Sequence, residues 1–307
     1  MRNWLARYRD TGLVESRRGL GYAIAAYAWW GLVPLYFTAL KPAGPLEVLV
    51  HRCVWTAVFG VLMLAALRRL RGLRAAVKPK LVLAAVVIAI NWLVYVYGVH
   101  TNQVVETSLG YFLNPLLTVI LGVTLLRERL RGLQWVAVGI GAAAGVILTV
   151  AYGRLPWIAI TLAVAFGTYG LIKKSVTVPA TEGVTVETLV LAPVALVYTL
   201  FFAGPDGNTF VSGSAWHTVL LVLAGPITGI PLLLYAGAAQ RLPLTMMGLL
   251  QYITPVLQFA LGVTVFGEDM PPVRLLGFGL VWLALAVLTF DGLRQRRQAA
   301  ALAVTGQ

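Results

Sequence analysis

The segment from Ser108 to Leu117, SLGYFLNPLL, places hydrogen-bonding residues inside an otherwise apolar run. Tyr111, Asn114 and Thr118 are spaced i, i+3 and i+7, which puts them on one face of a helix. Pro115 has no backbone N–H, so it leaves the carbonyl of Tyr111 without its usual helical partner. Because lipid cannot satisfy these groups, they are predicted to contact another helix or to line a wet cavity.

The same pattern recurs later in the chain, in QYITPVLQF. Gln251, Thr254 and Gln258 occupy the three corresponding positions, and Pro255 corresponds to Pro115. Each proline is predicted to kink its helix and to free a carbonyl beside a polar stripe. The two stripes either hold helices together or bind one solute between them, and their duplication favours a shared binding cavity.

A histidine and an arginine lie within the apolar segment LEVLVHRCVWTAVFGVLML. A buried arginine costs about 2.5–3.5 kcal/mol on the insertion scale, so Arg52 needs a carboxylate, a carbonyl or water. Glu47 lies four residues before His51 on the same helical face, which predicts a Glu–His pair able to carry a proton. Arg52 points about 100° away from His51 and either snorkels to the outer interface or contacts solute in the cavity.

Aromatic and amide residues extend the candidate site. In NWLVYVYG, Asn91 and Tyr95 share a helical face, although packing in the core is an alternative role for both. Trp30 and Tyr252 come from two other apolar segments. The predicted substrate-binding residues are Trp30, His51, Arg52, Asn91, Tyr95, Tyr111, Asn114, Gln251, Tyr252 and Gln258.

The elements that must position these residues are membrane-spanning helices. Of the 307 residues, 59% are hydrophobic and 11% are charged, against about 45–50% and 25% in soluble proteins. Apolar runs of about 20 residues, long enough to cross a bilayer, recur throughout the chain and predict ten helices. The predicted spans are 19–39, 46–67, 81–100, 107–126, 133–151, 155–173, 184–203, 215–238, 243–266 and 273–293.

The net charge of +13 follows the positive-inside pattern. If the N-terminus is cytoplasmic, the inner segments hold twenty lysines and arginines and the outer loops hold three. This distribution predicts a bacterial inner-membrane protein with both termini in the cytoplasm, and it makes nucleic-acid binding an unnecessary explanation of the charge. Residues 1–18 are too polar for a signal peptide and are predicted to form a frayed tail or to lie on the membrane surface. Residues 294–307 form a second predicted tail.

The chain repeats itself at an offset of 140 residues. The segment LNPLLTVILGVTLLRE, Leu113 to Glu128, aligns with ITPVLQFALGVTVFGE, Ile253 to Glu268. Because each unit has five predicted helices, an odd number, the second unit is predicted to enter the membrane from the opposite side. The predicted fold class is therefore all-α, with inverted repeats at 19–151 and 152–293. Transporters commonly use the seam between such repeats as an alternating-access site.

Five segments together resemble the RarD family of the drug/metabolite transporter superfamily, whose members carry two EamA repeats. The segments are HRCVW, NWLVYVYGV, ETSLGYFLNPLL, QYITPVLQF and the Gly-Glu pair after the ninth predicted helix. The resemblance implies ten helices, cytoplasmic termini, a central cavity lined by both repeats, and relatives that export amino acids and other small metabolites. Arg127-Glu128 stands where the family usually has Gly-Glu after the fourth helix.

No sequence motif points to an enzyme or a cofactor. The chain lacks GxxxxGK, HExxH, CxxC and GxSxG motifs, and its three histidines are scattered. We therefore expect a secondary transporter, an exporter or facilitator of a small metabolite, amino-acid-like or drug-like solute, without a metal or cofactor. It is expected to act in the lipid bilayer as a monomer, with a homodimer as the alternative. A membrane-embedded enzyme and a lipid flippase are the alternative functions, and a flippase predicts a lateral opening toward lipid.

Overall fold

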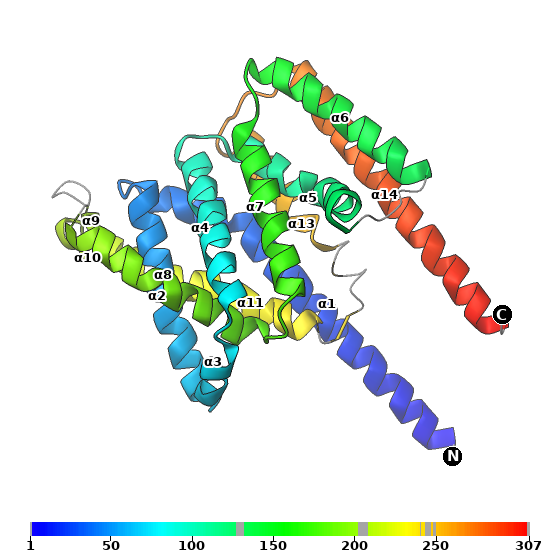
Figure 1. Ribbon diagram of the computed structural model, residues 1–307, viewed down its shortest axis with the longest axis horizontal. Helices are drawn as coiled ribbons and strands as arrows, with labels where there is room; N and C mark the ends of the chain where they lie inside the picture. The colour runs from blue at the N-terminus through cyan, green and yellow to red at the C-terminus, as the bar shows by residue number, and fades with distance from the viewer. Residues whose placement is uncertain are drawn as a thin grey trace.

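The computed structural model describes residues 2–126, 132–201, 208–239, 241–242, 247 and 250–305. Every regular element within these residues is a helix, as the sequence predicts. The helices are α1 (Arg2–Ala39), α2 (Pro45–Ala66), α3 (Leu70–Ala76), α4 (Pro79–His100), α5 (Val104–Leu126), α6 (Gly132–Tyr152), α7 (Trp157–Lys174), α8 (Ala180–Phe201), α9 (Thr209–Ser212), α10 (Ala215–Val222), α11 (Ala224–Ala239), α13 (Ile253–Thr264) and α14 (Pro272–Thr305) (Figure 1).

Local sequence signals explain where two central helices begin and end. Pro45 and Pro79 lie in the first turns of α2 and α4, where a missing backbone N–H costs no helical hydrogen bond. Arg68, which follows α2, and Asn102, which follows α4, adopt positive φ angles of 56° and 57°. A residue in the left-handed region ends a helix, because it turns the chain away from the helix axis.

Seven helices in the described part of the chain are long and apolar enough to cross a membrane. They are Arg17–Ala39, Pro45–Ala66, Pro79–His100, Gly132–Tyr152, Thr181–Phe201, Ala215–Ala238 and Pro272–Gly292. Two shorter apolar helices, Trp157–Lys173 and Ile253–Thr264, coincide with two further predicted spans. The remaining predicted span, 107–126, coincides with α5. Each predicted span therefore overlaps a helix, and part of the span at 243–266 lies outside the described residues.

The two ends of the chain differ from prediction. α1 begins at Arg2 and α14 runs to Thr305, so helix replaces most of the two predicted tails. Figure 1 shows both extensions projecting away from the bundle. Extending an existing helix adds one hydrogen bond for each residue fixed, and residues 2–18 contain no proline that would stop it. The tails are therefore continuations of the first and last helices.

The helix around Pro255 is interrupted by a turn at Gln251 and Tyr252, between the helical residue Leu250 and the start of α13. α13 begins at Ile253, so Pro255 lies in its first turn, whereas Pro115 lies inside α5 as predicted. The carbonyl of Gln251 is not free, because it accepts a hydrogen bond of 3.2 Å from the backbone N–H of Thr254. Since the first turn of a helix tolerates proline, the same residue type marks an interior position in α5 and an end in α13.

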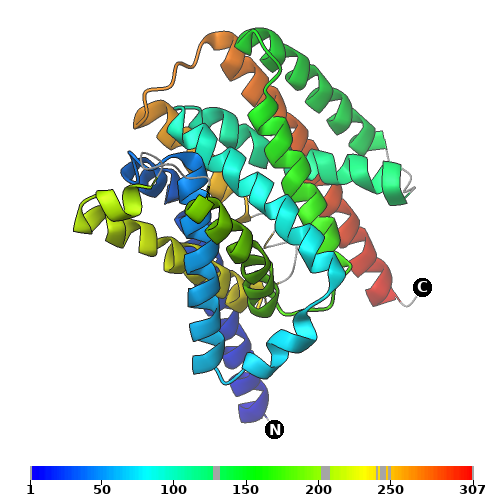
Figure 2. The ribbon, with the colours of Figure 1, turned by 60° about the vertical axis from the view of Figure 1, so that its left-hand side comes forward.

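Helices from distant parts of the chain pack together. α1 packs against α11 and α13, and α7 packs against α4 and α5. α2 packs against α8, α5 against α13, and α6 against α14. Figures 1 and 2 both show α6 and α14 side by side along one edge of the bundle. Where α2 meets α11, a Cβ atom on Gly225 would clash with the carbonyl oxygen of Trp55, so this close approach requires glycine.

Candidate functional site

Arg52 is buried inside the helix bundle without an acidic partner. Its side chain is 9% exposed, and its guanidinium carbon lies 4.2 Å from the centroid of the Trp92 ring and 5.4 Å from that of Phe37. No carboxylate in the described chain pairs with it, and its Nε atom has no hydrogen-bond partner there. Snorkelling to the outer surface therefore does not occur in this structure. The aromatic rings offset part of the cost of burying the charge.

Tyrosines complete the surroundings of Arg52. The phenol groups of Tyr36, Tyr95 and Tyr111 lie close enough to the guanidinium to interact with it electrostatically. Tyr95 is central, with its ring centroid 5.9 Å from that of Phe37 and 5.8 Å from that of Tyr111. We define the Arg52 cage as Arg52, Tyr36, Phe37, Trp92, Tyr95 and Tyr111. These residues come from α1, α2, α4 and α5, all within the first predicted repeat.

An amide ties the Arg52 cage to α7. The hydroxyl of Tyr111 donates to Oδ1 of Asn91 at 3.4 Å, and Nδ2 of Asn91 donates to the carbonyl oxygen of Leu162 at 3.2 Å. Asn91 is 1% exposed, so both ends of a deeply buried amide find partners within the protein. This arrangement holds the phenol of Tyr111 in place beside the guanidinium.

Gln258 connects the Arg52 cage to the second predicted repeat. From α13, its Nε2 atom donates to the hydroxyl oxygen of Tyr95 at 2.9 Å and to the carbonyl oxygen of Trp30 at 3.2 Å. The ring of Trp30 packs elsewhere, with its centroid 5.8 Å from that of Tyr27. Oε1 of Gln258 is buried and has no partner in the described chain. A buried amide oxygen left in this way costs free energy that a donor group beside it would recover.

The predicted stripe on α5 is only partly placed. Asn114 lies one turn beyond Tyr111 and is 5% exposed, so it faces protein and not lipid. The side chain of Thr118 lies outside the described residues. Tyr111 is therefore the member of this stripe that the structure assigns to the Arg52 cage.

The matching stripe on α13 divides between two roles. Thr254 donates its hydroxyl to the backbone carbonyl of Tyr27 at 2.8 Å, which joins α13 to α1. Gln251 lies in the turn before α13. Tyr252 packs against the apolar cluster that contains Phe278. Gln258 is thus the residue of this stripe that reaches the Arg52 cage, and the predicted equivalence of the two stripes does not extend to Gln251.

Glu47 and His51 do not form the predicted pair. Oε1 of Glu47 accepts hydrogen bonds from the backbone N–H of Thr209 at 2.6 Å and from that of Phe210 at 3.2 Å. His51 stacks on the Phe210 ring at 4.7 Å between centroids, and its Nδ1 accepts from Nε1 of Trp55 at 3.1 Å. The carboxylate of Glu47 caps the start of α9 because several N–H donors there outweigh one imidazole. Both residues therefore lie at the contact with α9 and not in the Arg52 cage.

Two further carboxylates cap helix starts at the same end of the bundle. Glu268, in the loop before α14, accepts from the backbone N–H groups of Val104 and Val105 at the start of α5, at 3.1 Å for Val105. Glu106 accepts from the N–H of Ile158 at 3.0 Å and forms an ion pair of 2.7 Å with Arg154. Burial raises the pKa of Glu268 to about 7, although the N–H donors of α5 lower it. These contacts join segments from the two predicted repeats.

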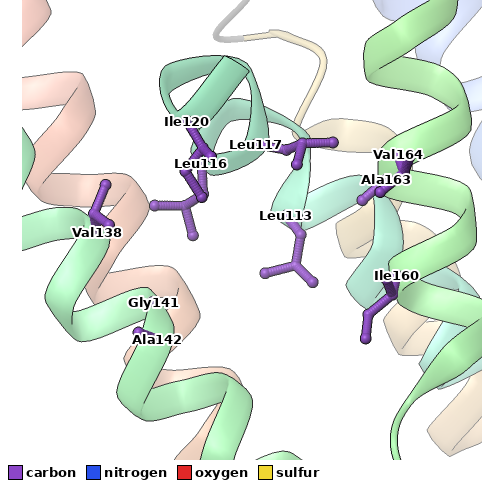
Figure 3. Close-up of a pocket in the computed structure, with 10 residues that line it drawn as sticks. All are labelled: Leu113, Leu116, Leu117, Ile120, Val138, Gly141, Ala142, Ile160, Ala163 and Val164. Carbon is purple, nitrogen blue, oxygen red and sulfur yellow. The ribbon is translucent and has the colours of Figure 1, made fainter. Parts of the chain in front are cut away.

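Two cavities outside the Arg52 cage are apolar. A cavity of about 210 Å³ opens between α5, α6 and α7, and Figure 3 shows Leu113, Val138 and Ile160 among the side chains that line it. A second cavity of about 360 Å³ extends beside it toward α14. Neither lining includes a charged residue. The cavities therefore lack the chemistry to orient a polar solute, which the Arg52 cage has.

Three members of the Arg52 cage, Tyr36, Phe37 and Trp92, are not among the predicted substrate-binding residues. A signal was present, because Phe37 follows Trp30 by seven residues and so lies on the same face of α1. Helical spacing on one segment does not reveal which other helix that face meets. The contact with Arg52 depends on the packing of α1 against α4 and the rest of the bundle.

The chain is similar to a family of transporters over nearly its whole length. Residues 17–151 match the EamA-like transporter family. Protein RarD of Streptomyces exfoliatus is 47% identical over 292 residues, covering 94% of this chain and 93% of that one. The uncharacterized transporter YojE of Bacillus subtilis is 40% identical, covering 92% of this chain and 97% of that one. The chloramphenicol-sensitive protein RarD of Pseudomonas aeruginosa is 31% identical, covering 93% and 98%.

A solved crystal structure shares the fold. It superposes with a TM-score of 0.61 over 89% of this chain and 97% of that chain, at 20% sequence identity. At this identity the likeness concerns the arrangement of helices and carries no residue roles.

Proposed function

Because the chain belongs to the RarD family of EamA-like transporters, we propose that it is a secondary transporter for a small metabolite, amino-acid-like or drug-like solute. The solute binds at the Arg52 cage, between two inverted five-helix repeats, and crosses by alternating access. As a multi-pass membrane protein of the drug/metabolite transporter superfamily, the chain lies in the lipid bilayer. The direction that we propose is export or facilitated diffusion.

The pattern of helix packing supports inverted repeats. In the proposed arrangement the helices of the two repeats correspond as α1 with α7, α2 with α8, α4 with the α10–α11 unit, α5 with α13, and α6 with α14. If each helix is replaced by its counterpart in the other repeat, the contact of α1 with α11 becomes the contact of α7 with α4, and the contact of α1 with α13 becomes that of α7 with α5. All four of these contacts are present. The contacts of α2 with α8, α5 with α13 and α6 with α14 are unchanged by the same replacement. A pseudo-two-fold axis produces this set.

One observation carries the proposal, the hydrogen bond from Gln258 to Tyr95. It brings a side chain of the second repeat into a site whose other members belong to the first. A solute held in the Arg52 cage therefore lies at the seam of the two repeats, where relative movement of the repeats changes its surroundings. Alternating access requires a binding site in this position.

We propose that both termini face the cytoplasm of a bacterial inner membrane. The charge distribution supports this orientation, with twenty basic residues on the inner side and three on the outer side. The first turns of α2 and α5, which carry Glu47 and Glu106, and the loop that carries Glu268 then lie at the outer end, where the carboxylate contacts tie the repeats together. Movement of solute to the outside requires those contacts to open.

A second candidate function is the movement of an amphipathic lipid between leaflets. The apolar cavities between α5, α6 and α7 favour it, because a flippase needs an apolar path beside its polar site for an acyl chain (Figure 3). Measuring the movement of a fluorescent phospholipid between the leaflets of proteoliposomes that contain the purified protein tests this candidate. Translocation of the phospholipid without flux of water-soluble solutes would replace the transporter proposal with a flippase.

Flux measurement in proteoliposomes tests the transporter proposal. Purified protein is reconstituted, and efflux of labelled amino acids and drugs is followed with and without a pH gradient. We expect at least one solute to leave faster than from protein-free vesicles, at a rate that saturates with concentration. Glu47→Gln and His51→Gln separately test proton coupling, since loss of stimulation by the gradient in either variant would support a coupling role. Uniform, non-saturating leakage of all solutes would contradict the proposal.

A further inference from the structure

We propose that the transported solute is an organic monoanion, whose carboxylate binds the guanidinium of Arg52 and whose aromatic or apolar body packs against the rings of the Arg52 cage. This inference rests on the proposed function, because it names the substrate class of the same site. Arg52 would then bind the solute directly, and this role is separate from the packing of the helices.

The first argument is the missing counter-charge. A guanidinium carries five N–H donors and stays ionised. Arg52 is 9% exposed, and neither a carboxylate nor a second cation of the described chain lies in the cage. The neighbouring rings of Trp92 and Phe37 contribute no hydrogen-bond acceptor. Burial of an ion without a partner is costly, so the site gains most from a ligand that brings the opposite charge.

The second argument concerns the hydroxyl proton of Tyr95. Its hydroxyl oxygen already accepts a hydrogen bond from Gln258, and no described residue accepts the proton of the same hydroxyl. Tyr95 and Arg52 thus present unused donors within one cage. An ionised carboxylate accepts hydrogen bonds and donates none, so it matches both. An ammonium group would meet donors on both sides and would be repelled by the guanidinium.

The third argument concerns the number of charges on the solute and the chemistry of the rest of the molecule. One guanidinium balances one negative charge, so a dianionic phosphate ester would leave a buried excess charge. A planar carboxylate pairs with a guanidinium through two parallel hydrogen bonds. The walls of the cage are phenyl, indole and phenol rings, which favour an aromatic or apolar body by stacking and burial. A monocarboxylate with a ring fits each of these features.

The alternative role for Arg52 is structural, through its contacts with Trp92 and Phe37. The two roles predict opposite effects of Arg52→Met, which replaces the charge with an apolar chain of similar length. If Arg52 stabilises the fold, Tm in detergent falls. If Arg52 is an unpaired charge kept for recognition, removing it relieves the burial cost and Tm rises while anion binding is lost.

Thermal shift measurements on the purified full-length protein test the inference. The probes are benzoate, its neutral isostere benzamide, and phenyl phosphate. We expect benzoate to raise Tm more than benzamide does, and more than phenyl phosphate does. In Arg52→Met the preference for benzoate over benzamide should fall by about tenfold to a hundredfold in apparent affinity. Arg52→Lys keeps the charge without the paired geometry and should retain part of the preference.

Control variants and opposite outcomes make the test decisive. Val58→Leu, at a position of α2 that is 42% exposed, should keep the full preference. Equal shifts with benzoate and benzamide in the unmodified protein would overturn the inference, as would an undiminished preference in Arg52→Met. A larger rise in Tm with phenyl phosphate than with benzoate would overturn the proposal that the solute is a monoanion. Arg52→Lys keeps the test valid if Arg52→Met does not fold.

Flux of benzenesulfonate separates this inference from the transport proposal. Benzenesulfonate is a permanently ionised monoanion, so it does not cross lipid in a neutral form. A benzoate preference that depends on Arg52, without flux of benzenesulfonate or any other solute, would keep the anion site and reject transport. Saturable flux of neutral solutes that is unchanged in Arg52→Met, without a benzoate preference, would keep transport and reject the anion site.

Discussion

The side-chain amide of Gln258 donates a hydrogen bond of 2.9 Å to the hydroxyl oxygen of Tyr95, although the two residues are 163 positions apart in the chain. The bond joins α13 to α4 inside the bundle, and both side chains are almost fully buried. If the repeats move against each other, this bond must break or move with one of them. It is therefore a point where solute binding at Tyr95 and movement of the repeats can be coupled.

We expect Gln258→Leu to reduce solute flux by about twofold to tenfold, because the substitution removes a hydrogen bond worth about 0.5–1.5 kcal/mol at the seam of the repeats. Val256→Leu is the matched control, since it lies on the same helix at a position that is 51% exposed. Initial rates of efflux from proteoliposomes measure the effect. Flux in Gln258→Leu equal to that in Val256→Leu would reduce Gln258 to a packing residue.

Thr254 and Asn114 separate helix packing from solute binding. The hydroxyl of Thr254 donates to the carbonyl of Tyr27, so Thr254→Val should lower stability by about 0.5–1.5 kcal/mol and leave solute affinity unchanged. Asn114→Leu should weaken solute affinity if Asn114 lines the binding site. Tm and affinity are measured on the same detergent samples. A loss of stability without a loss of affinity in Asn114→Leu would assign Asn114 to helix packing, as Thr254 already is.

The sequence predicts helix positions well because membrane spans have a strong local signal. About 20 apolar residues in a row are unusual for a loop, and each predicted span overlaps a helix of the structure. Helix ends depend on weaker signals. Pro255 illustrates this, since proline is tolerated both at a kink and in a first turn, and the sequence alone does not choose between them.

The candidate site is predictable only in part, because it depends on contacts between helices. Arg52, Asn91, Tyr95, Tyr111 and Gln258 are predicted from polarity within apolar segments, and the structure brings these five together. The spacing on α2 predicts that Glu47 pairs with His51, whereas the carboxylate of Glu47 reaches the N–H groups of α9. Spacing within one helix cannot identify a partner that lies on a different element.

Topology can be tested with single cysteines in a Cys53→Ala background, since Cys53 is the one cysteine of the chain. We expect an impermeant maleimide to label Lys41→Cys and Asp269→Cys in intact cells. Arg71→Cys should react only after the membrane is disrupted. All three positions are exposed in the structure, so differences in labelling report the side of the membrane. Labelling of Arg71→Cys in intact cells would reverse the proposed orientation.

Glu268 should make the stability of the protein depend on pH. Burial raises its pKa to about 7 in the folded protein, from 4.5 in the absence of the surrounding structure. The folded state therefore binds a proton more tightly than the unfolded state does. The stability contributed by this proton is fully present below pH 4.5 and is lost as the pH rises through about 7.

We expect Tm in detergent to fall between pH 5 and pH 8 in the unmodified protein, and to fall less in Glu268→Gln. The amide of the variant does not titrate in this range, and its Oε1 can still accept from the N–H groups of α5 that the carboxylate contacts. Asp269→Asn is the matched control, because Asp269 is an exposed neighbour in the same loop. Equal slopes of Tm against pH in Glu268→Gln and the unmodified protein would contradict the assignment. A steeper fall in Glu268→Gln would mean that the carboxylate is ionised in the folded state and held by the N-terminus of α5.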